Sequence, residues 1–190
     1  MTYSNALTTH YLKLAKLPIN EDDFAGSDVR YSTEYELLEN ELAKANALHE
    51  SGIIDWQKVR ENSEVLLSAH SKDLRVAAWL IWGLYQRESF AGLQAGLSLL
   101  HYLCLNHWND LHPRKPRTRA AAISWLIPRL EQALAEHVPV GEQLPLFRNL
   151  AEQLRTLEAC LSEHLGENAP LLLPLCRRLD ELVSRASQGQ

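Results

Sequence analysis

The sequence predicts an all-α fold, a multi-helix bundle of about seven helices that ends in an antiparallel helical hairpin. Leu and Ala dominate its apolar residues, β-branched residues are sparse, and only 8 Gly and 8 Pro occur in 190 residues. This composition favours helices because Leu and Ala lose little conformational freedom on entering one. Apolar residues recur at spacings of three and four, whereas no alternating pattern flanks an Asn-Gly or Asp-Gly turn.

Residues 1–30 are expected to form an N-terminal segment that packs on the bundle. An apolar patch there (Tyr11, Leu12, Leu14, Leu17) predicts a short helix that Pro18 ends. The next helix begins after Ser32 or Thr33, either of which can cap its first turn, and ends at Gly52. Its predicted apolar stripe consists of Leu37, Leu38, Leu42, Ala45 and Leu48, with Glu36, Glu39 and Glu41 outside the stripe.

Residues 31–137 are expected to form the helical core. Asp55 is the predicted cap of a second helix with the apolar face Trp56, Val59, Ser63, Leu66 and Leu67. Ser71 is the predicted cap of a third, with Asp73 near the positive end of the helix dipole. This third helix, residues 74–84, is apolar on nearly all sides, so other helices should surround it.

A fourth helix is predicted to begin near Ser89 and to end around Trp108. Gly92 and Gly96 lie on it at a four-residue spacing. Small residues placed in this way let two backbones approach closely, so they predict tight helix packing.

The last third of the chain contains one interrupted helix and a helical pair. Pro128 lies inside the fifth predicted helix, residues 118–137, and should kink or break it. Two amphipathic patterns follow over residues 138–190: Gly166 ends the first, Asn168 can cap the second, and Pro174 marks the start of its regular helix. A short loop between them predicts the antiparallel hairpin, as part of the same domain as the core.

Net charge is −5 but is unevenly distributed. Residues 1–70 hold six Lys or Arg against twelve Asp or Glu, residues 71–130 eight against three, and residues 131–190 five against nine. An acidic first part can fold against a basic middle, or either can face a partner. The overall negative charge argues against a nucleic-acid binder.

Neither a membrane span nor a secretion signal is predicted. The longest uncharged run near the middle, residues 76–86, falls short of the roughly 20 apolar residues that a bilayer crossing needs. The polar N-terminus lacks a basic stretch followed by an apolar run. The odd set Cys104, Cys160 and Cys176 lies in apolar helical patterns, which indicates reduced, buried thiols.

No catalytic, cofactor or metal site is predicted. The best metal candidate is His101, Cys104 and His107 with His112 beyond them, but His101 and His107 are six residues apart and point to different sides of a helix. The motifs that activate a nucleophile, cradle a phosphate or bind zinc on a helix are missing. The chain is therefore not expected to be an enzyme or to need a cofactor.

Two charged features are interpreted as contacts. The connector with Arg114, Lys115, Arg117 and Arg119 is a solvated loop or a patch for an acidic protein partner. Arg75 lies in the most apolar helix, where a charge needs a partner. We expect an ion pair with Asp28; the alternative is that Arg75 recognises the carboxylate of a partner.

Several short motifs in order resemble the ImpA N-terminal domain family over about residues 17–130. They include the sequences Leu17-Pro18-Ile19, Asp28, Arg30-Tyr31-Ser32, Glu34-Tyr35-Glu36, Ser71-Lys72-Asp73-Leu74-Arg75-Val76-Ala77-Ala78-Trp79-Leu80, Phe90-Ala91-Gly92-Leu93 and Trp108-Asn109-Asp110-Leu111-His112-Pro113. The matched Asp28, Arg30, Asp73, Arg75 and Trp79 are interpreted as a structural motif that ties the leading loop to the buried helix.

The resemblance implies a TssA-like, non-enzymatic component of the bacterial type VI secretion system, working in the cytoplasm. Implied partners are baseplate, tube, sheath or membrane-complex proteins, with a homo-oligomer as a further option and with no nucleic acid or membrane insertion. Long family members continue into further domains, so the chain is either a short member or a fragment. A different class stays open: a small helical adaptor or regulator that binds a ligand between its helices.

Overall fold

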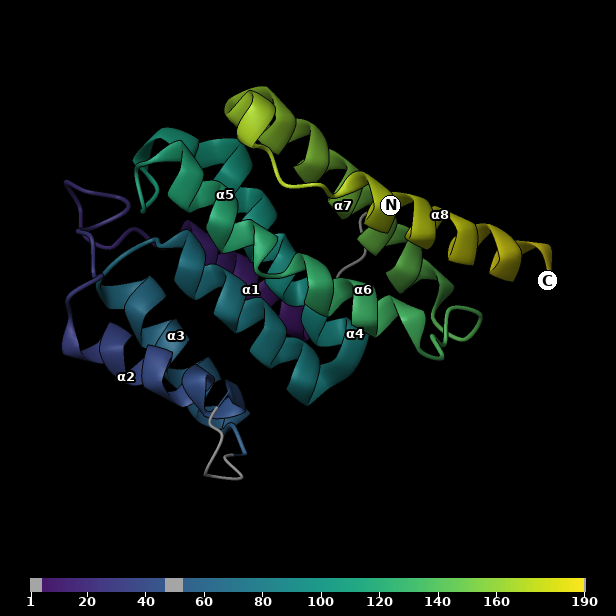
Figure 1. Ribbon diagram of the computed structural model, residues 1–190, viewed down its shortest axis with the longest axis horizontal. Coiled ribbons are helices and arrows are strands. Elements are labelled where there is room, and N and C mark those ends of the chain that lie inside the picture. Colours follow the sequence, from purple (N-terminus) through teal and green to yellow (C-terminus); the bar gives the residue numbers. More distant parts are fainter. Residues whose placement is uncertain (1–4, 47–52, 190) are drawn as a thin grey trace.

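The computed structural model describes residues 5–46 and 53–189, and these residues form helices with no β-strand among them (Figure 1). The α-helices are α1 (Ala6–Lys16), α2 (Thr33–Ala43), α3 (Trp56–Ala69), α4 (Leu74–His107), α5 (Pro116–Ser124), α6 (Ile127–Ala135), α7 (Leu144–Leu165) and α8 (Leu173–Gln188). Short 3-10 turns are η1 (Lys44–Asn46), η2 (Trp108–Asp110) and η3 (Gly166–Asn168). The all-α, multi-helix fold predicted from the sequence is confirmed.

The long helix α4 is divided into two arms at Ser89. Ser89 has φ 55° and ψ −142°, a backbone conformation that a helix cannot contain, and the chain reverses there. Residues 74–88 form the first arm and residues 90–107 the second, which returns along the first (Figure 1). The sequence prediction of separate helices on the two sides of Ser89 is therefore confirmed.

The two arms approach so closely that only glycine fits between them at two positions. A Cβ atom on Gly92 would lie 2.1 Å from the backbone O of Leu84, and one on Gly96 would lie 3.0 Å from the Cα of Ile81. Because residue 92 faces residue 84 and residue 96 faces residue 81, the arms run in opposite directions. The tight packing predicted from the glycine spacing is confirmed.

The other helices pack around these arms, as the apolar first arm predicted. Helices α1, α3, α5 and α7 all contact α4, α2 packs on α3, and α8 packs on both α7 and α6. At the last pair, Arg148 donates to Ser187 and Arg155 pairs with Asp180, so the start of α7 lies beside the end of α8. Because α8 also contacts α6, the pair is not a free-standing hairpin, and the predicted hairpin ending stays an interpretation.

One hydrophobic cluster runs through all three stretches of the chain that the sequence set apart. It includes Leu14, Leu80 and Leu157, from residues 1–30, 31–137 and 138–190 in turn. A polar layer crosses this core, in which Gln94 donates to Asn149 (2.8 Å) and Gln153 donates to Ser98 (2.7 Å), linking the second arm to α7. These two bonds satisfy part of the polar layer, whereas Oε1 of Gln153 is buried without a hydrogen-bond partner among the described residues. How the chain divides into domains stays a prediction.

Local signals placed most helix ends correctly. Asp55 caps α3, α7 ends at Gly166 with φ 53°, and Pro174 lies in the first turn of α8. Pro128 lies in the first turn of α6, and the predicted fifth helix is broken just before it into α5 and α6. The expected helix end at Gly52 lies outside the described residues.

Four local predictions were wrong. Asp73, and not Ser71, caps α4, since its carboxylate accepts the backbone N–H groups of Arg75 and Val76. Asn168 is part of η3 and does not cap α8, which begins after Leu172. On α2, Leu38 is buried as predicted, but Leu37 is exposed and Glu41 is buried, the opposite of the prediction for these two positions. Glu41 is tolerated inside because its carboxylate accepts from the N–H of Asp55 and pairs with Lys44.

We predict that Gly92→Ala lowers the free energy of unfolding by about 2–4 kcal/mol, because the added methyl group would overlap a backbone oxygen that cannot move alone. Gly141→Ala is the matched control, since nothing lies within 4 Å of a Cβ atom there. It should change stability by less than about 0.5 kcal/mol. Urea unfolding followed by circular dichroism measures both; equal effects would contradict the close approach of the two arms.

Candidate interaction site

Three segments meet at the start of α4 and hydrogen-bond through their backbones. The N–H of Lys72 donates to Ala25 O (2.8 Å), the N–H of His112 donates to Lys72 O (3.1 Å), and the N–H of Leu74 donates to His112 O (2.7 Å). The stretch before α4 thus lies between the leading loop, residues 17–32 between α1 and α2, and the connector that follows η2. We call this arrangement the junction, residues 25–28, 70–75 and 112.

Gly26 is required at the junction for its backbone conformation and its lack of a side chain. Its φ is 70°, and a Cβ atom would lie 2.2 Å from His70 O. The Gly26 carbonyl also lies 2.7 Å from Nε2 of the buried His112. The leading loop is therefore fixed on two sides before it enters α2.

Asp73 and Arg75 form the charged part of the junction. Asp73 is fully buried and lies 2.6 Å from Nη2 of Arg75, and Asp28 lies 3.3 Å from the same nitrogen, which is the ion pair expected from the sequence. Burial opposes the charge of Arg75, yet hydrogen bonding and charge from Asp73 raise the pKa of Arg75 above its ordinary value. Burial by itself would raise the pKa of Asp28, but the hydrogen bond from the Arg30 N–H and the charge of Arg75 outweigh it and lower that pKa.

Lys72 is buried beside this pair without a carboxylate partner among the described residues. Its Nζ donates to Leu14 O (2.9 Å) near the end of α1 and to Leu67 O (2.7 Å) near the end of α3. A cation is favourable at helix C-termini, where backbone carbonyls lack partners. Burial nevertheless lowers the pKa of Lys72 to about 8. The sequence motif includes Lys72, but its burial was not predicted, because Lys is rarely buried.

A hollow of about 650 Å³ lies beside the junction. Its lining is Arg30, Tyr31, Ser32, Tyr35, Glu36, Glu39, Arg75 and Thr118. Tyr31 is 92% exposed, with the guanidinium of Arg30 5.7 Å from its ring centre. Tyr35 forms the inner wall and packs against Trp79 at a ring separation of 5.1 Å. The structure thus brings Asp28, Asp73 and Arg75 together in the junction. It places Trp79 against Tyr35, whose ring also lies under the Arg75 guanidinium, and it leaves Arg30 exposed at the hollow.

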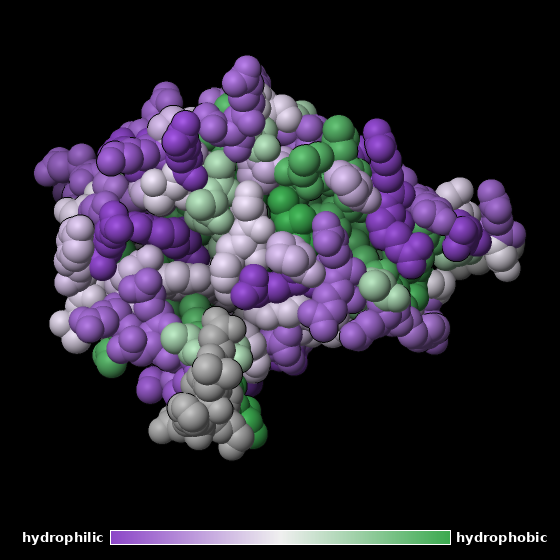
Figure 2. Space-filling view, viewed as in Figure 1, coloured by the Kyte–Doolittle hydropathy of each residue, from purple (hydrophilic) through white to green (hydrophobic). Residues whose placement is uncertain are grey.

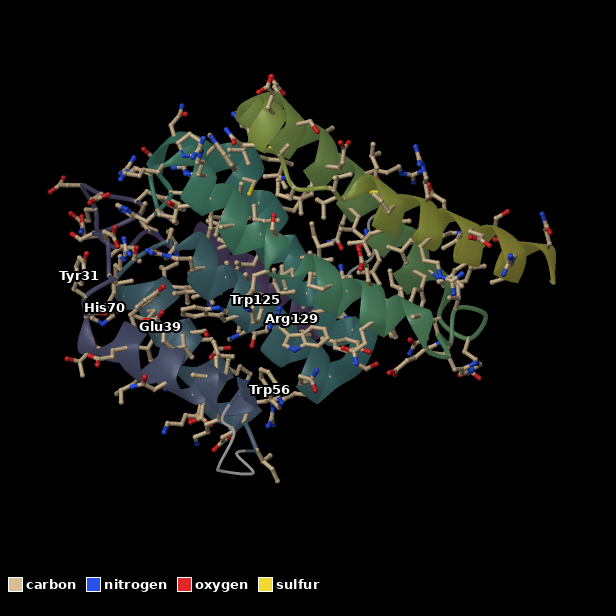
Figure 3. All side chains as sticks on the ribbon, in the orientation of Figure 1. Tyr31, Glu39, Trp56, His70, Trp125 and Arg129 are labelled. Carbon is tan, nitrogen blue, oxygen red and sulfur yellow. The ribbon has the colours of Figure 1, made fainter. Side chains whose placement is uncertain are left out.

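Aromatic side chains continue this face along the first arm of α4 (Figure 3). Trp56, from α3, packs over Gly83, and Trp125, at the end of α5, is half-buried on the other side of the arm. Figure 3 shows Trp125 and Arg129 near the middle of this face, with Glu39 and Trp56 across from them. We call the hollow together with Trp56, Trp125 and Arg129 the docking face.

Arg129 is a half-buried charge of the docking face that interacts with Trp125. Its guanidinium carbon lies 3.6 Å from the ring centre of Trp125, and Nη1 donates to Trp125 O (2.6 Å). None of the ion pairs among the described residues includes it. Burial lowers the pKa of Arg129 below its ordinary value. A partner carboxylate would complete the hydrogen bonding of this guanidinium.

The basic connector is only partly available to a partner. Arg114, Lys115 and Arg117 are exposed, and Arg114 donates to Asn109 O. Arg119 is a correction to the predicted patch: it is buried and donates to the carbonyls of Trp108, Leu111 and Pro113. This arginine closes the turn after η2, so its charge satisfies backbone groups and does not face solvent.

The candidate metal ligands are used for packing. The ring of His107 stacks on Phe24, His112 bonds to Gly26, and Cys104 is fully buried. Within residues 5–46 and 53–189, no group of three or more His, Cys, Asp or Glu is placed to hold a metal ion. All three cysteines are free and buried, as predicted.

Hydrophobic residues also gather around the start of α8, where Leu171 and Leu173 are exposed (Figure 2).

None of the helices in the described part of the chain is long and apolar enough to cross a membrane.

Comparison with known proteins agrees with the motifs at the junction. The family model described as ImpA, N-terminal, type VI secretion system matches residues 17–128, which is more than half of the chain. The chain belongs to the ImpA N-terminal family. It is therefore a type VI secretion system component, and residues 17–128 contain the junction and most of the docking face.

A solved structure shares the fold of this ImpA N-terminal family member. It is the N-terminal domain, including the conserved ImpA_N region, of the TssA component of the type VI secretion system from Burkholderia cenocepacia. The TM-score is 0.67 at 20% sequence identity, and the match covers 94% of each chain. No curated protein matches the sequence.

We predict that Asp73→Ala lowers the free energy of unfolding by about 3–5 kcal/mol, because it leaves Arg75 half-buried without its main partner and removes the cap of α4. Asp28→Ala, which removes an exposed partner of the same arginine, should cost less than about 1 kcal/mol. Chemical denaturation of both variants checks the order; a larger loss for Asp28→Ala would reverse the assignment.

We also predict that the contribution of Lys72 to stability increases with pH. Between pH 8 and 10 the unfolded chain keeps a proton that the folded chain releases, since burial lowers the Lys72 pKa from 10.5 to about 8. Stability rises with pH wherever the unfolded state binds more protons. The stability difference between the wild type and Lys72→Met should increase by about 2 kcal/mol over this range. Urea unfolding at several pH values measures it, and a constant difference would contradict the prediction.

Proposed function

We propose that this chain is a non-enzymatic assembly protein of the type VI secretion system that works on the cytoplasmic side of the apparatus. Its ImpA N-terminal domain docks on a protein of the baseplate, tube, sheath or membrane complex. Membership of the family supports the first part of the proposal. The docking face supports the second.

The observation that carries the docking proposal is that Arg129 is half-buried and has no carboxylate partner among the described residues. A half-buried guanidinium stacked on Trp125 has lost part of its hydration, yet it lacks a carboxylate among the described residues. Trp, Tyr and Arg are the residues that dominate binding energy at protein interfaces. Tyr31, Trp56 and Trp125 accompany Arg129 on one face, so the face has the composition of a binding hot spot.

The exposed connector arginines offer the main competing surface. Exposed charges mainly change association rates and salt dependence, whereas a desolvated arginine changes the dissociation rate. The two surfaces can therefore be separated by one charge reversal in each. Arg129→Glu tests the docking face, and Arg117→Glu is the matched reversal in the connector.

We predict that Arg129→Glu weakens binding to the cognate baseplate, tube, sheath or membrane-complex protein by about tenfold or more, mainly through faster dissociation. Arg117→Glu should weaken it by less than about threefold. Biolayer interferometry with each purified secretion protein measures the rates, and circular dichroism confirms that both variants are folded.

The opposite order would assign docking to the connector. Absence of binding to every secretion protein of the four groups would overturn the proposed function.

A further inference from the structure

A second hollow, of about 520 Å³, lies between α1 and α3. It is lined by His10, Lys13, Leu14 and Leu17 on one side and by Glu61, Glu64, Val65 and Ser68 on the other. Both sets have the spacing i, i+3, i+4, i+7, which is two turns along one face of a helix. The hollow is therefore a groove that follows both helices, and we call it the α1–α3 groove.

The floor of the α1–α3 groove is apolar and in part uncovered. Leu17 is 50% exposed and Val65 is 49% exposed, and Leu14 lies buried between their helices. Single exposed apolar residues need no explanation. Here two large apolar side chains, one from each side, line the same groove. Covering them with a partner removes apolar surface from water, which lowers the free energy of the complex.

The two rims of the groove carry opposite charges. The α1 rim has His10 and Lys13, and the α3 rim has Glu61 and Glu64. Glu64 is already engaged, since it accepts from the Tyr11 hydroxyl and lies 3.5 Å from His10.

Lys13 and Glu61 take part in none of the ion pairs within the described residues. Glu61 accepts one hydrogen bond, from the Gln57 side chain. A positive charge on one rim and a negative charge on the other are thus left for a ligand.

We propose that the α1–α3 groove binds an amphipathic helix of a partner protein. Its apolar stripe covers Leu17 and Val65, an acidic flank faces Lys13, and a basic flank faces Glu61. A helix laid in a groove is read at positions i, i+3 or i+4, and i+7, which is the spacing that the two walls offer. The opposite rim charges fix the direction of the bound helix, because turning it end to end exchanges its flanks.

This groove shares no lining residue with the docking face. The chain can therefore hold a partner helix in the groove and a second protein at the docking face at the same time, as a bridging component does. The inference is independent of the proposed function: Val65 variants test the groove, whereas Arg129 variants test the docking face.

The probe is a synthetic helical peptide of about 16 residues with a Leu stripe, Glu on one flank and Lys on the other. The control peptide has Gln on both flanks. The charged peptide should bind the full chain about fivefold or more tighter at low salt. A nitroxide at its N-terminus should broaden NMR signals at one end of the groove only. In the double variant Lys13→Glu with Glu61→Lys, the broadening should move to the other end.

Val65→Glu should weaken binding of the charged peptide to the chain by about tenfold or more. Leu105→Glu is the matched control, since Leu105 on α4 is 48% exposed and lies outside the groove. It should change binding by less than about twofold.

The proposal is overturned if neither peptide binds the chain, or if Val65→Glu and Leu105→Glu weaken peptide binding equally. It is also overturned if the charged and the control peptide bind equally well with no preferred direction. It is also overturned if sedimentation of the chain alone shows a dimer that Val65→Glu dissociates, because a second copy would then occupy the groove.

Discussion

A fully buried carboxylate that caps the start of α4 lies where the leading loop and the connector meet that helix. Asp73 is held there by two backbone N–H groups and by Arg75, and its neighbours on both sides hydrogen-bond to the leading loop and to the connector. The leading loop then places Arg30 and Tyr31, and the connector leads into α5 and so to Trp125. Losing this charge pair would loosen both walls of the docking face, because a buried charge without its partner is strongly unfavourable.

The two arms of α4 supply the rigid platform behind these walls. Gly92 and Gly96 let the arms touch backbone to backbone, which leaves the outer faces of both arms free for α1, α3, α5 and α7. Such close packing resists deformation, so the docking face and the α1–α3 groove lie on a fixed scaffold. The two hollows described above differ in chemistry: that of the docking face is lined by two tyrosines with arginines and glutamates, whereas the α1–α3 groove is apolar between rims of opposite charge.

The sequence identified part of the candidate site. Arg75 in an apolar helix required a partner, and Asp28 and Asp73 are both in contact with it. Arg119 was assigned to a surface patch because it stands among exposed basic residues, but the chain turns it inward onto three carbonyls. The burial of Lys72 and the stacking of Arg129 on Trp125 were not predicted, because the neighbouring residues in the sequence indicate neither contact.

The sequence by itself determined the all-helical fold, the breaks at Ser89, before Pro128 and at Gly166, and the tight contact through Gly92 and Gly96. These features depend on the 3.6-residue period, on the backbone limits of proline and on the small size of glycine, which are local properties. Only the tertiary structure decided which charges are buried and which surfaces stay open. Leu17 and Val65 line the same groove although they are 48 residues apart in the sequence. Whether that groove is covered depends on how α1 and α3 pack on α4. That packing is a sum over contacts distant in the sequence, which no single segment encodes.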